Sequence, residues 1–233
     1  MSALDPVLAL IPARGGSKGL PHKNLSDVGG LSLTARAVQC ARTWGRFDRI
    51  VVSTDSDAIA ANAAVAGAEV THRPAHLATD SADVADTIDH ALEVLAGDGF
   101  KPEVVVLLEP SCPLRTSEMI DQTLEALDDA DAAFTVSAVP SRFHPRKQFA
   151  VDGDGMARYV VSDAPPPVRR QELSSTFVKN GAVYAFRTAM FRAHRSVLGP
   201  APRAVVIAAP LVNIDSLEDL TEARRLAAGQ GGA

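Results

Sequence analysis

The loop that follows the first apolar run of the chain has the residue types of a phosphate-binding site. From position 12 to 24 the sequence reads PARGGSKGLPHKN, in which Gly15, Gly16 and Gly19 free the backbone and three cations lie close to them: Arg14, Lys18 and Lys23. Backbone N–H groups of a glycine turn can converge on phosphate oxygens, and cations offset the charge of those oxygens. The pattern predicts a site for a compact anion such as a nucleoside triphosphate.

Other interpretations of this loop start from the same glycines. The loop has neither the Gly-Lys-Ser/Thr ending of a Walker A motif nor the GxGxxG spacing of a dinucleotide fingerprint. The run from Gly15 to Gly19 does satisfy GxSxG, the nucleophile elbow of α/β hydrolases, with Ser17 as the nucleophile. An elbow needs a helix that starts at the serine, yet Pro21 follows closely, and it needs a later histidine, for which His194 is the candidate. We prefer the phosphate loop and keep the elbow and a plain surface loop as alternatives.

The elements that would position this loop alternate between strand and helix. Short apolar runs predict buried strands, and apolar residues at helical spacing predict amphipathic helices. The predicted strands cover 7–11, 49–54, 69–71, 104–108, 132–139, 179–186 and 204–207, and the predicted helices cover 31–44, 57–66, 82–96, 117–128 and a last one from Ser216. This alternation is typical of a three-layer α/β/α, Rossmann-like fold with a mostly parallel sheet, whose ligands bind beyond the carboxyl ends of the strands.

The 233 residues, of which 46% are hydrophobic, can form the core of a single domain over 1–233. One stretch, about 141–176, breaks the alternation of strand and helix. It contains Pro145, the prolines at 165–167 and the basic pair Arg169 and Arg170. This composition predicts an insertion or arm of the same domain.

Composition and charge also exclude several classes of partner. The formal net charge is −5 and the 23 Lys and Arg residues are dispersed, which argues against nucleic-acid binding. No apolar run approaches the roughly 18 residues that would span a bilayer, and the N-terminus does not have the pattern of a signal peptide. Two cysteines, Cys40 and Cys112, are too few for a disulfide framework and are expected to be packing residues. These features predict a cytoplasmic protein without a membrane partner.

The glycine loop and five later segments together resemble the acylneuraminate cytidylyltransferases, also called CMP-sialic acid synthetases. Residues 9–24 match the opening of these enzymes nearly residue for residue. The resemblance continues through STD at 53–55, RPAHLA at 73–78, LEPSCPLR at 108–115, NGAVY at 180–184 and NID at 213–215. It therefore covers essentially the whole chain in order and implies a nucleotidyltransferase form of the predicted fold.

The resemblance implies an enzyme that joins CTP to the anomeric hydroxyl of a nonulosonic acid, a nine-carbon 2-keto sugar acid, with release of pyrophosphate and a need for a divalent metal, usually Mg²⁺. Lys23, Arg14 and Asp215 would be the catalytic residues, because transfer at phosphorus needs positioning and charge more than a covalent nucleophile. Arg73 would help to select the base. The positions matched to CTP binding are Arg14, Gly15, Gly16, Ser17, Lys18, Asn24 and Arg73.

The implied metal ligand is Asp215, which lies after a predicted strand and before the last helix. Members of the family usually have an acidic residue at the position of Asn213 as well. Asn213 can still ligate Mg²⁺ through its carbonyl or a water, but with one negative charge fewer, which leaves the number of metal ions open. The alternative is that Asp215 only caps the last helix together with Ser216.

For the acceptor sugar, the resemblance points to Glu109, Lys147, Arg170 and Tyr184, of which Lys147 and Arg170 would pair with the sugar carboxylate. Well-known sialate enzymes have glutamine where this chain has Glu109, which leaves the identity of the sugar open. By the same resemblance the arm would pair with a second subunit in a homodimer. The remaining alternatives are a nucleotidyltransferase for a different sugar acid or a sugar phosphate, and a non-catalytic CTP-binding homologue.

Overall fold

A seven-stranded sheet forms the centre of the computed structural model, which describes residues 6–17, 19–128, 130–161 and 173–230. Its strand order is β11-β7-β10-β6-β1-β4-β5, and β10 alone runs antiparallel to both of its neighbours among these strands. The strands are β1 (Val7–Pro12), β4 (Arg49–Thr54), β5 (Glu69–His72), β6 (Val104–Leu107), β7 (Ala132–Ala138), β10 (Phe177–Arg187) and β11 (Arg203–Val206). The predicted α/β fold with a mostly parallel sheet is confirmed.

Strand β1 lies at the middle of the sheet and is buried on both faces. Side chains of a strand point alternately to opposite faces. Ile11 and Ala9 belong to the apolar cluster on one face, whereas Leu8 and Leu10 belong to the cluster on the other, and all four are fully buried. This double burial explains why the segment reads as a continuous apolar run rather than an alternating one.

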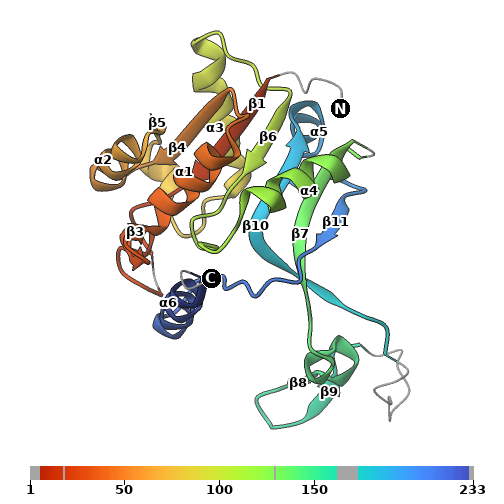
Figure 1. Cartoon of the computed structure of the whole chain (residues 1–233). Helices are drawn as coiled ribbons and strands as arrows, with labels where there is room; N and C mark the ends of the chain where they lie inside the picture. The colour runs from red at the N-terminus through yellow and green to blue at the C-terminus, as the bar shows by residue number, and fades with distance from the viewer. Residues whose placement is uncertain (1–5, 18, 129, 162–172, 231–233) are drawn as a thin grey trace.

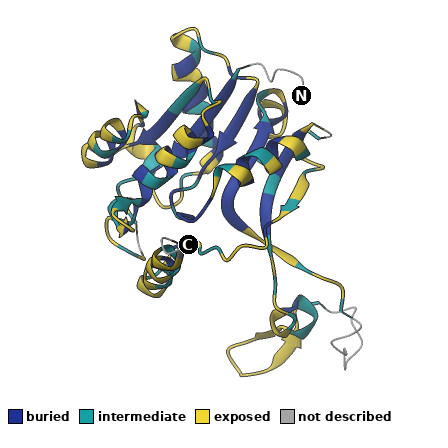
Figure 2. Ribbon diagram, in the orientation of Figure 1, coloured by how far each residue is buried: buried dark blue, intermediate teal, exposed yellow. Residues whose placement is uncertain are grey.

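Helices cover both faces of the sheet (Figure 1). On one face lie α1 (Leu33–Trp44), α2 (Asp57–Ala66) and α4 (Ser117–Leu127), and on the other lie α3 (Val84–Gly97) and α5 (Thr188–His194). Helix α6 (Leu217–Gln230) instead packs at the end of the sheet against the hairpin of β2 (Asp27–Val28) and β3 (Leu31–Ser32). Buried residues concentrate in the strands between these layers (Figure 2).

Short polar side chains fix where the helices begin. The Ser32 hydroxyl accepts a hydrogen bond from the N–H of Ala35 at 3.0 Å, so α1 starts two residues later than predicted. At the start of α6, Ser216 and Asp219 form the reciprocal contacts of a capping box: the N–H of Asp219 donates to the Ser216 hydroxyl at 3.2 Å, and the N–H of Ser216 donates to the Asp219 carboxylate at 2.9 Å. Capping residues thus set the orientation of the loops that lead into these helices.

An arm projects from the sheet where β7 ends and β10 begins (Figure 1). Its described part contains the 3₁₀ turns η3 (Ser141–Phe143) and η4 (Pro145–Lys147) and a small antiparallel hairpin of β8 (Phe149–Val151) and β9 (Ala157–Tyr159). Figure 2 shows that the hairpin is exposed, in contrast to the central strands. The N–H of Val139 donates to the carbonyl of Thr176 at 2.9 Å where the two connecting segments leave the body.

The sequence did not predict several features of the fold. Helix α5, both small hairpins and the reversed direction of β10 were missed, although the predicted strands and helices match the observed ones to within about two residues. Strand β10 follows the arm directly instead of a crossover helix, so it can enter the sheet in the opposite direction. Among the described residues, the helices are too short or too polar to cross a membrane.

Candidate active site

The loop after β1 is held on both sides by side chains. The N–H of Gly15 donates to Asp55 Oδ1 at 2.8 Å, and Asn24 Nδ2 donates to the Arg14 carbonyl at 2.9 Å. Gly15 lies so close to Ser56 that only glycine fits at this position, because an added Cβ would lie 2.9 Å from the Cβ of Ser56. These contacts fix the backbone at Arg14 and Gly15, just beyond the carboxyl end of β1.

The predicted backbone donors of the loop differ in what they contact. The N–H of Gly15, expected to face a phosphate, is used by Asp55 in this structure. Gly16 and Ser17 make no hydrogen bond to another described residue. Lys18 lies outside the described residues. The N–H groups of Gly16 and Ser17 and the Ser17 hydroxyl are therefore available to a ligand.

The hydrolase alternative for this loop is wrong. A nucleophile elbow places the serine at the start of a helix. Residue 17 has no regular secondary structure, the next element is the short 3₁₀ turn η1 (Lys23–Leu25), and the next α-helix begins only at Leu33.

A cavity of about 310 Å³ lies beyond the carboxyl ends of β1, β5 and β6. Five residues that the sequence singled out line it: Arg14, Lys23, Asn24, Arg73 and Glu109. Residues between Leu77 and Thr87, from the end of the turn η2 (Ala75–Ala78) to the start of α3, also line it. The fold thus brings distant segments together at the edge where a doubly wound sheet binds its ligands.

Two ion pairs lie at this cavity. Lys23 Nζ donates to Asp215 Oδ1 at 2.9 Å and to the Ile214 carbonyl at 2.8 Å. Arg14 Nη1 lies 2.8 Å from Asp80 Oδ1, across the cavity. Asp80 was not among the site residues predicted from the sequence, so its contact with Arg14 is a feature that the structure adds.

Arg73 is the most deeply buried cation that lines the cavity. It follows β5, and its side chain is 8% exposed. Arg73 Nη1 donates to Thr87 Oγ1 at 2.8 Å and, more weakly, to the Leu77 carbonyl at 3.4 Å. Burial lowers the pKa of Arg73, and the nearby charge of Arg14 lowers it further while Asp55 opposes the shift. The sheet and α3 therefore hold a positive charge at the base of the cavity.

Glu109 follows β6, and its carboxylate lies beside a bulge of β10. Gly181 in this bulge has φ of +73°, a conformation that glycine adopts without strain. A Cβ at Gly181 would lie 2.7 Å from Glu109 Oε2 and 3.3 Å from the side-chain amide nitrogen of Asn213. The Glu109 carboxylate and the Asn213 amide therefore converge at one end of the site.

Cations surround Glu109 without forming an ion pair with its carboxylate among the described residues. Burial raises the pKa of the Glu109 carboxyl, whereas the charges of Arg115, Lys179 and Lys23 oppose this shift. Arg115 Nη2 donates to the backbone carbonyl of Glu109, and its Nε donates to the Ala182 carbonyl at 2.8 Å. No site role was predicted for Arg115 or Lys179, because the positions of their charges around the Glu109 carboxylate depend on the fold.

Asp215 has a mostly exposed carboxylate that does not cap α6. Its Oδ1 contacts Lys23, whereas Ser216 and Asp219 make the cap, so the capping alternative for Asp215 is wrong. A Cβ at Gly19 would collide with the Asp215 carbonyl, so the glycine loop and this segment pack directly together. Asp215 is thereby fixed next to the proposed triphosphate loop.

The donors present here fit a magnesium ion that is shared with a ligand. Among the described residues no group of three or more His, Cys, Asp and Glu side chains could hold a metal by itself. Mg²⁺ prefers oxygen ligands and is commonly bound by one or two carboxylates together with substrate phosphates and waters. The Asp215 carboxylate and the Asn213 amide oxygen are donors of that kind.

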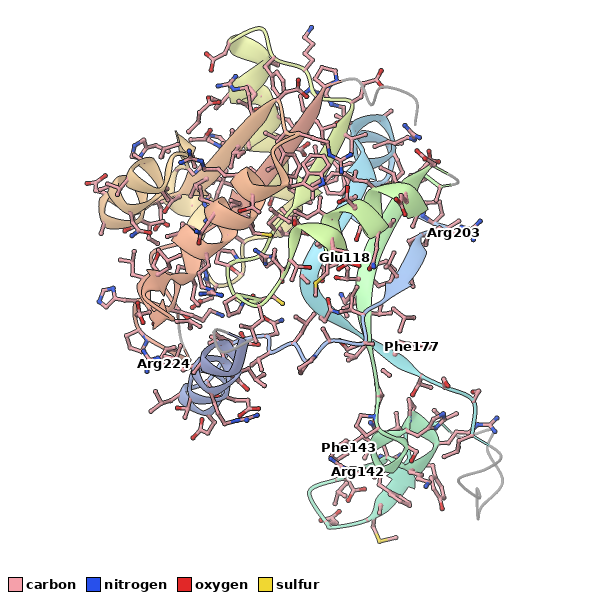
Figure 3. All side chains as sticks on the ribbon, viewed as in Figure 1. Glu118, Arg142, Phe143, Phe177, Arg203 and Arg224 are labelled. Atoms are coloured by element: carbon pink, nitrogen blue, oxygen red, sulfur yellow. The ribbon has the colours of Figure 1, made fainter. Side chains whose placement is uncertain are left out.

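The residues predicted for the sugar are less closely grouped. Lys147 belongs to η4 on the arm, away from the cavity; Figure 3 labels its neighbours Arg142 and Phe143 there. Tyr184 is 6% exposed, and its ring stacks on Phe134 with centroids 6.3 Å apart. Burial raises the pKa of Tyr184, and the charge of nearby Glu109 adds to the shift. Arg170 lies outside the described residues.

The cysteines match the expected packing role. Cys112 is fully buried and Cys40 is partly buried, and both thiols are free. Burial raises the pKa of Cys112 to about 11, which keeps this thiol protonated at neutral pH. It therefore has no reactive thiolate to contribute to the site.

Comparison with known proteins shows which family the chain resembles. The family model described as "Cytidylyltransferase" matches residues 8–230. Post-translational flagellin modification protein B of Campylobacter coli is 32% identical over 199 residues, which cover 84% of this chain and 83% of that protein. Pseudaminic acid cytidylyltransferase of Campylobacter jejuni is 28% identical over 221 residues, which cover 94% of this chain and 95% of that protein. CMP-N,N'-diacetyllegionaminic acid synthase of Legionella pneumophila is 38% identical over 151 residues, or 64% of each chain.

A solved structure supports the fold. CMP:2-keto-3-deoxy-manno-octonic acid synthetase, determined in complex with CTP, aligns with a TM-score of 0.71 over 97% of this chain and 99% of its own, at 19% identity. The family match, the relatives and the fold together confirm the expected nucleotidyltransferase. The chain belongs to the cytidylyltransferase family.

Proposed function

We propose that this protein joins CTP to the anomeric hydroxyl of a nonulosonic acid and releases pyrophosphate. The observation that carries the proposal is the cavity beyond β1, β5 and β6, where Arg14, Lys23, Asn24 and Arg73 meet Glu109. Cations and a buried amide suit the phosphates and base of a nucleotide. The names of the pseudaminic and legionaminic acid relatives support the acceptor class.

In this reaction the 2-hydroxyl oxygen of the sugar acid bonds to the α-phosphorus. The bond from that phosphorus to the bridging oxygen of pyrophosphate breaks, and the hydroxyl proton passes to water. Lys23 and Arg14 stabilise the negative charge on the phosphate oxygens, with Gly16, Ser17 and Lys18 as further donors. Both cations contact carboxylates in the structure, so the incoming triphosphate replaces Asp215 and Asp80 as their partner.

Mg²⁺ is the proposed metal, held by Asp215 and by Asn213 directly or through a water. When bound, it would neutralise part of the phosphate charge. Asp215 is suited to this because its carboxylate is mostly exposed and is already oriented by Lys23. When the triphosphate binds Lys23, the Asp215 carboxylate becomes available to Mg²⁺.

The acceptor would lie at the end of the cavity near Glu109, where Asn213, Lys179 and Tyr184 are its neighbours. A carboxylate at position 109 accepts hydrogen bonds only, so it suits a hydroxyl or N–H of the sugar. Lys147 belongs to η4 on the projecting arm, and no residue of the described arm lines the cavity. We therefore assign Lys147, with Arg170, to the acceptor site of a second copy.

The arm provides an apolar surface for that second copy. Its exposed large apolar residues are Phe143, Phe149, Val151, Met156, Tyr159, Val160, Phe177 and Val178, and the first and seventh of them are labelled in Figure 3. An apolar group of this extent on a projecting segment is typical of a subunit interface. A homodimer in which each arm meets the other subunit would bury these residues.

The alternatives are distinguished by what the protein does with CTP. A different sugar acid or a sugar phosphate as acceptor would still give pyrophosphate, but with another conjugate. A non-catalytic homologue would bind CTP without turnover. A cytoplasmic location remains a prediction from the sequence.

The acceptor class can be measured directly. The protein is incubated with CTP and Mg²⁺ and, in separate reactions, N-acetylneuraminic, pseudaminic and diacetyllegionaminic acids, an eight-carbon 2-keto acid and a sugar phosphate. We expect pyrophosphate release and a CMP conjugate, identified by mass spectrometry, with at least one nonulosonic acid. Formation of a conjugate only with the eight-carbon acid or the sugar phosphate would replace the proposed acceptor, and CTP binding without any conjugate would favour the non-catalytic homologue.

Lys23→Ala removes the cation that contacts Asp215, Ile214 and the proposed triphosphate. We expect kcat to fall by about 10²–10³-fold, the usual effect of removing one group that stabilises transition-state charge. Turnover is followed by pyrophosphate release at saturating CTP. The matched control is Lys101→Ala, an exposed lysine at a separate cavity, which should retain wild-type turnover. Wild-type kcat in the Lys23 variant would remove Lys23 from the catalytic set.

Asp215→Asn keeps a hydrogen-bond acceptor for Lys23 and removes the charge proposed to bind Mg²⁺. We expect the Mg²⁺ concentration for half-maximal activity to rise by about tenfold or more, equivalent to about 1.4 kcal/mol of binding free energy. Glu125→Gln, an exposed change on α4, serves as the control. An unchanged magnesium titration for the Asp215 variant would exclude this carboxylate as a ligand.

The proposed dimer has a simple test by light scattering coupled to size exclusion. We expect a mass twice the 24.5 kDa of one chain for the wild type. Val151→Glu, on the exposed arm hairpin, should shift the protein toward monomer because it would bury a charge at the interface. Val65→Glu, at an 89% exposed position on α2, should stay dimeric. A monomeric wild type would refute the dimer.

A further inference from the structure

The backbone of Arg73 is fixed by the sheet, but the orientation of its guanidinium depends on α3. The N–H of Arg73 donates to the Thr54 carbonyl at 2.8 Å, which ties the residue to the end of β4. Nη1 makes the two side-chain contacts, to Thr87 Oγ1 at 2.8 Å and to the Leu77 carbonyl at 3.4 Å. The shorter bond to Thr87 is the stronger of the two. Nε is buried and has no partner among the described residues.

Thr87 is a polar residue on the apolar face of α3. It is 2% exposed and lies among buried apolar side chains of the same helix: Ala85, Ile88, Ala91, Leu92 and Leu95. Valine has nearly the shape of threonine, so packing alone does not require a hydroxyl here. A buried hydroxyl is unfavourable unless it is hydrogen-bonded, and the described partner of this one is Arg73.

The orientation of Arg73 matters because a guanidinium can only donate hydrogen bonds. Cytosine presents two neighbouring acceptors, O2 and N3, whereas uracil carries a hydrogen on N3. Nη1 is bound to Thr87 and Nε is buried, so Nη2, which makes no bond to another described residue either, is the nitrogen available to a base in the cavity. If Nη2 is held in a fixed position, it can donate to N3 of cytosine. In uracil it would face the N3–H group, which is itself a donor.

We propose that Thr87 is a positioning residue that holds Arg73 in the orientation that distinguishes cytosine from uracil. The inference rests on the proposed function, in which CTP is the nucleotide and Arg73 lies at its base. Thr87 itself need not touch the nucleotide. Its hydroxyl keeps the guanidinium from turning within the cavity wall, so that the donor aimed at the base is always the same one.

The test is nucleotide binding without acceptor, measured by calorimetry with CTP and with UTP on the full-length protein. Thr87→Val should weaken CTP roughly tenfold and reduce the preference for CTP over UTP by a similar factor, because a hydrogen bond to a charged group is lost. Thr87→Ser retains the hydroxyl and should therefore keep most of the CTP affinity and most of the preference for CTP over UTP. Thr123→Val is the matched control, since Thr123 is also fully buried in a helix but bonds only the Met119 carbonyl of its own helix, at 2.6 Å.

Each outcome decides one question. A protein that binds neither nucleotide refutes the proposed function itself. CTP preference in the wild type that is unchanged in Thr87→Val refutes the role of Thr87 alone, as does an equal loss of CTP and UTP affinity. Failure of Thr87→Ser to restore the preference, with thermal unfolding like that of the wild type, would also refute it.

Discussion

The contact between Lys23 and the segment 214–215 is the interaction on which the site depends. It joins the loop after the first strand to the connection before the last helix, and these are separated by 191 and 192 residues along the chain. The direct packing of Gly19 on the Asp215 carbonyl strengthens the same junction. Because Lys23 lines the cavity, this junction also holds the Asp215 carboxylate next to it.

Charge in the cavity is arranged so that each cation has a defined position before any ligand arrives. Arg14 and Lys23 have carboxylate partners, whereas Arg73 is held by a hydroxyl and a carbonyl. Preorganised charges of this kind need little rearrangement when a reaction develops negative charge. Glu109 differs from these cations because it has no ion-pair partner among the described residues. Burial disfavours the charge of its carboxylate, whereas three neighbouring cations favour it. The lining of the cavity therefore contains both carboxylates and cations.

Much of the fold and the centre of the site could be predicted from the sequence. The run Val7–Pro12, the glycine loop and the motif around Glu109 are local patterns, and their places beyond parallel strands follow from the fold class. The contacts of Asp80, Lys179 and Thr87 could not be predicted, because each depends on how distant segments meet. The direction of β10 was also hidden, since a buried strand has the same composition in either direction.

Strand β10 links the arm directly to the central sheet. It is eleven residues long; its first residues leave the arm, its middle carries the bulge at Gly181, and its end pairs with β6 at the core. Because the arm and the bulge are joined by one strand, a tilt of the arm would act on the backbone next to Glu109. The geometry of the acidic end of the cavity is for this reason sensitive to whatever the arm touches.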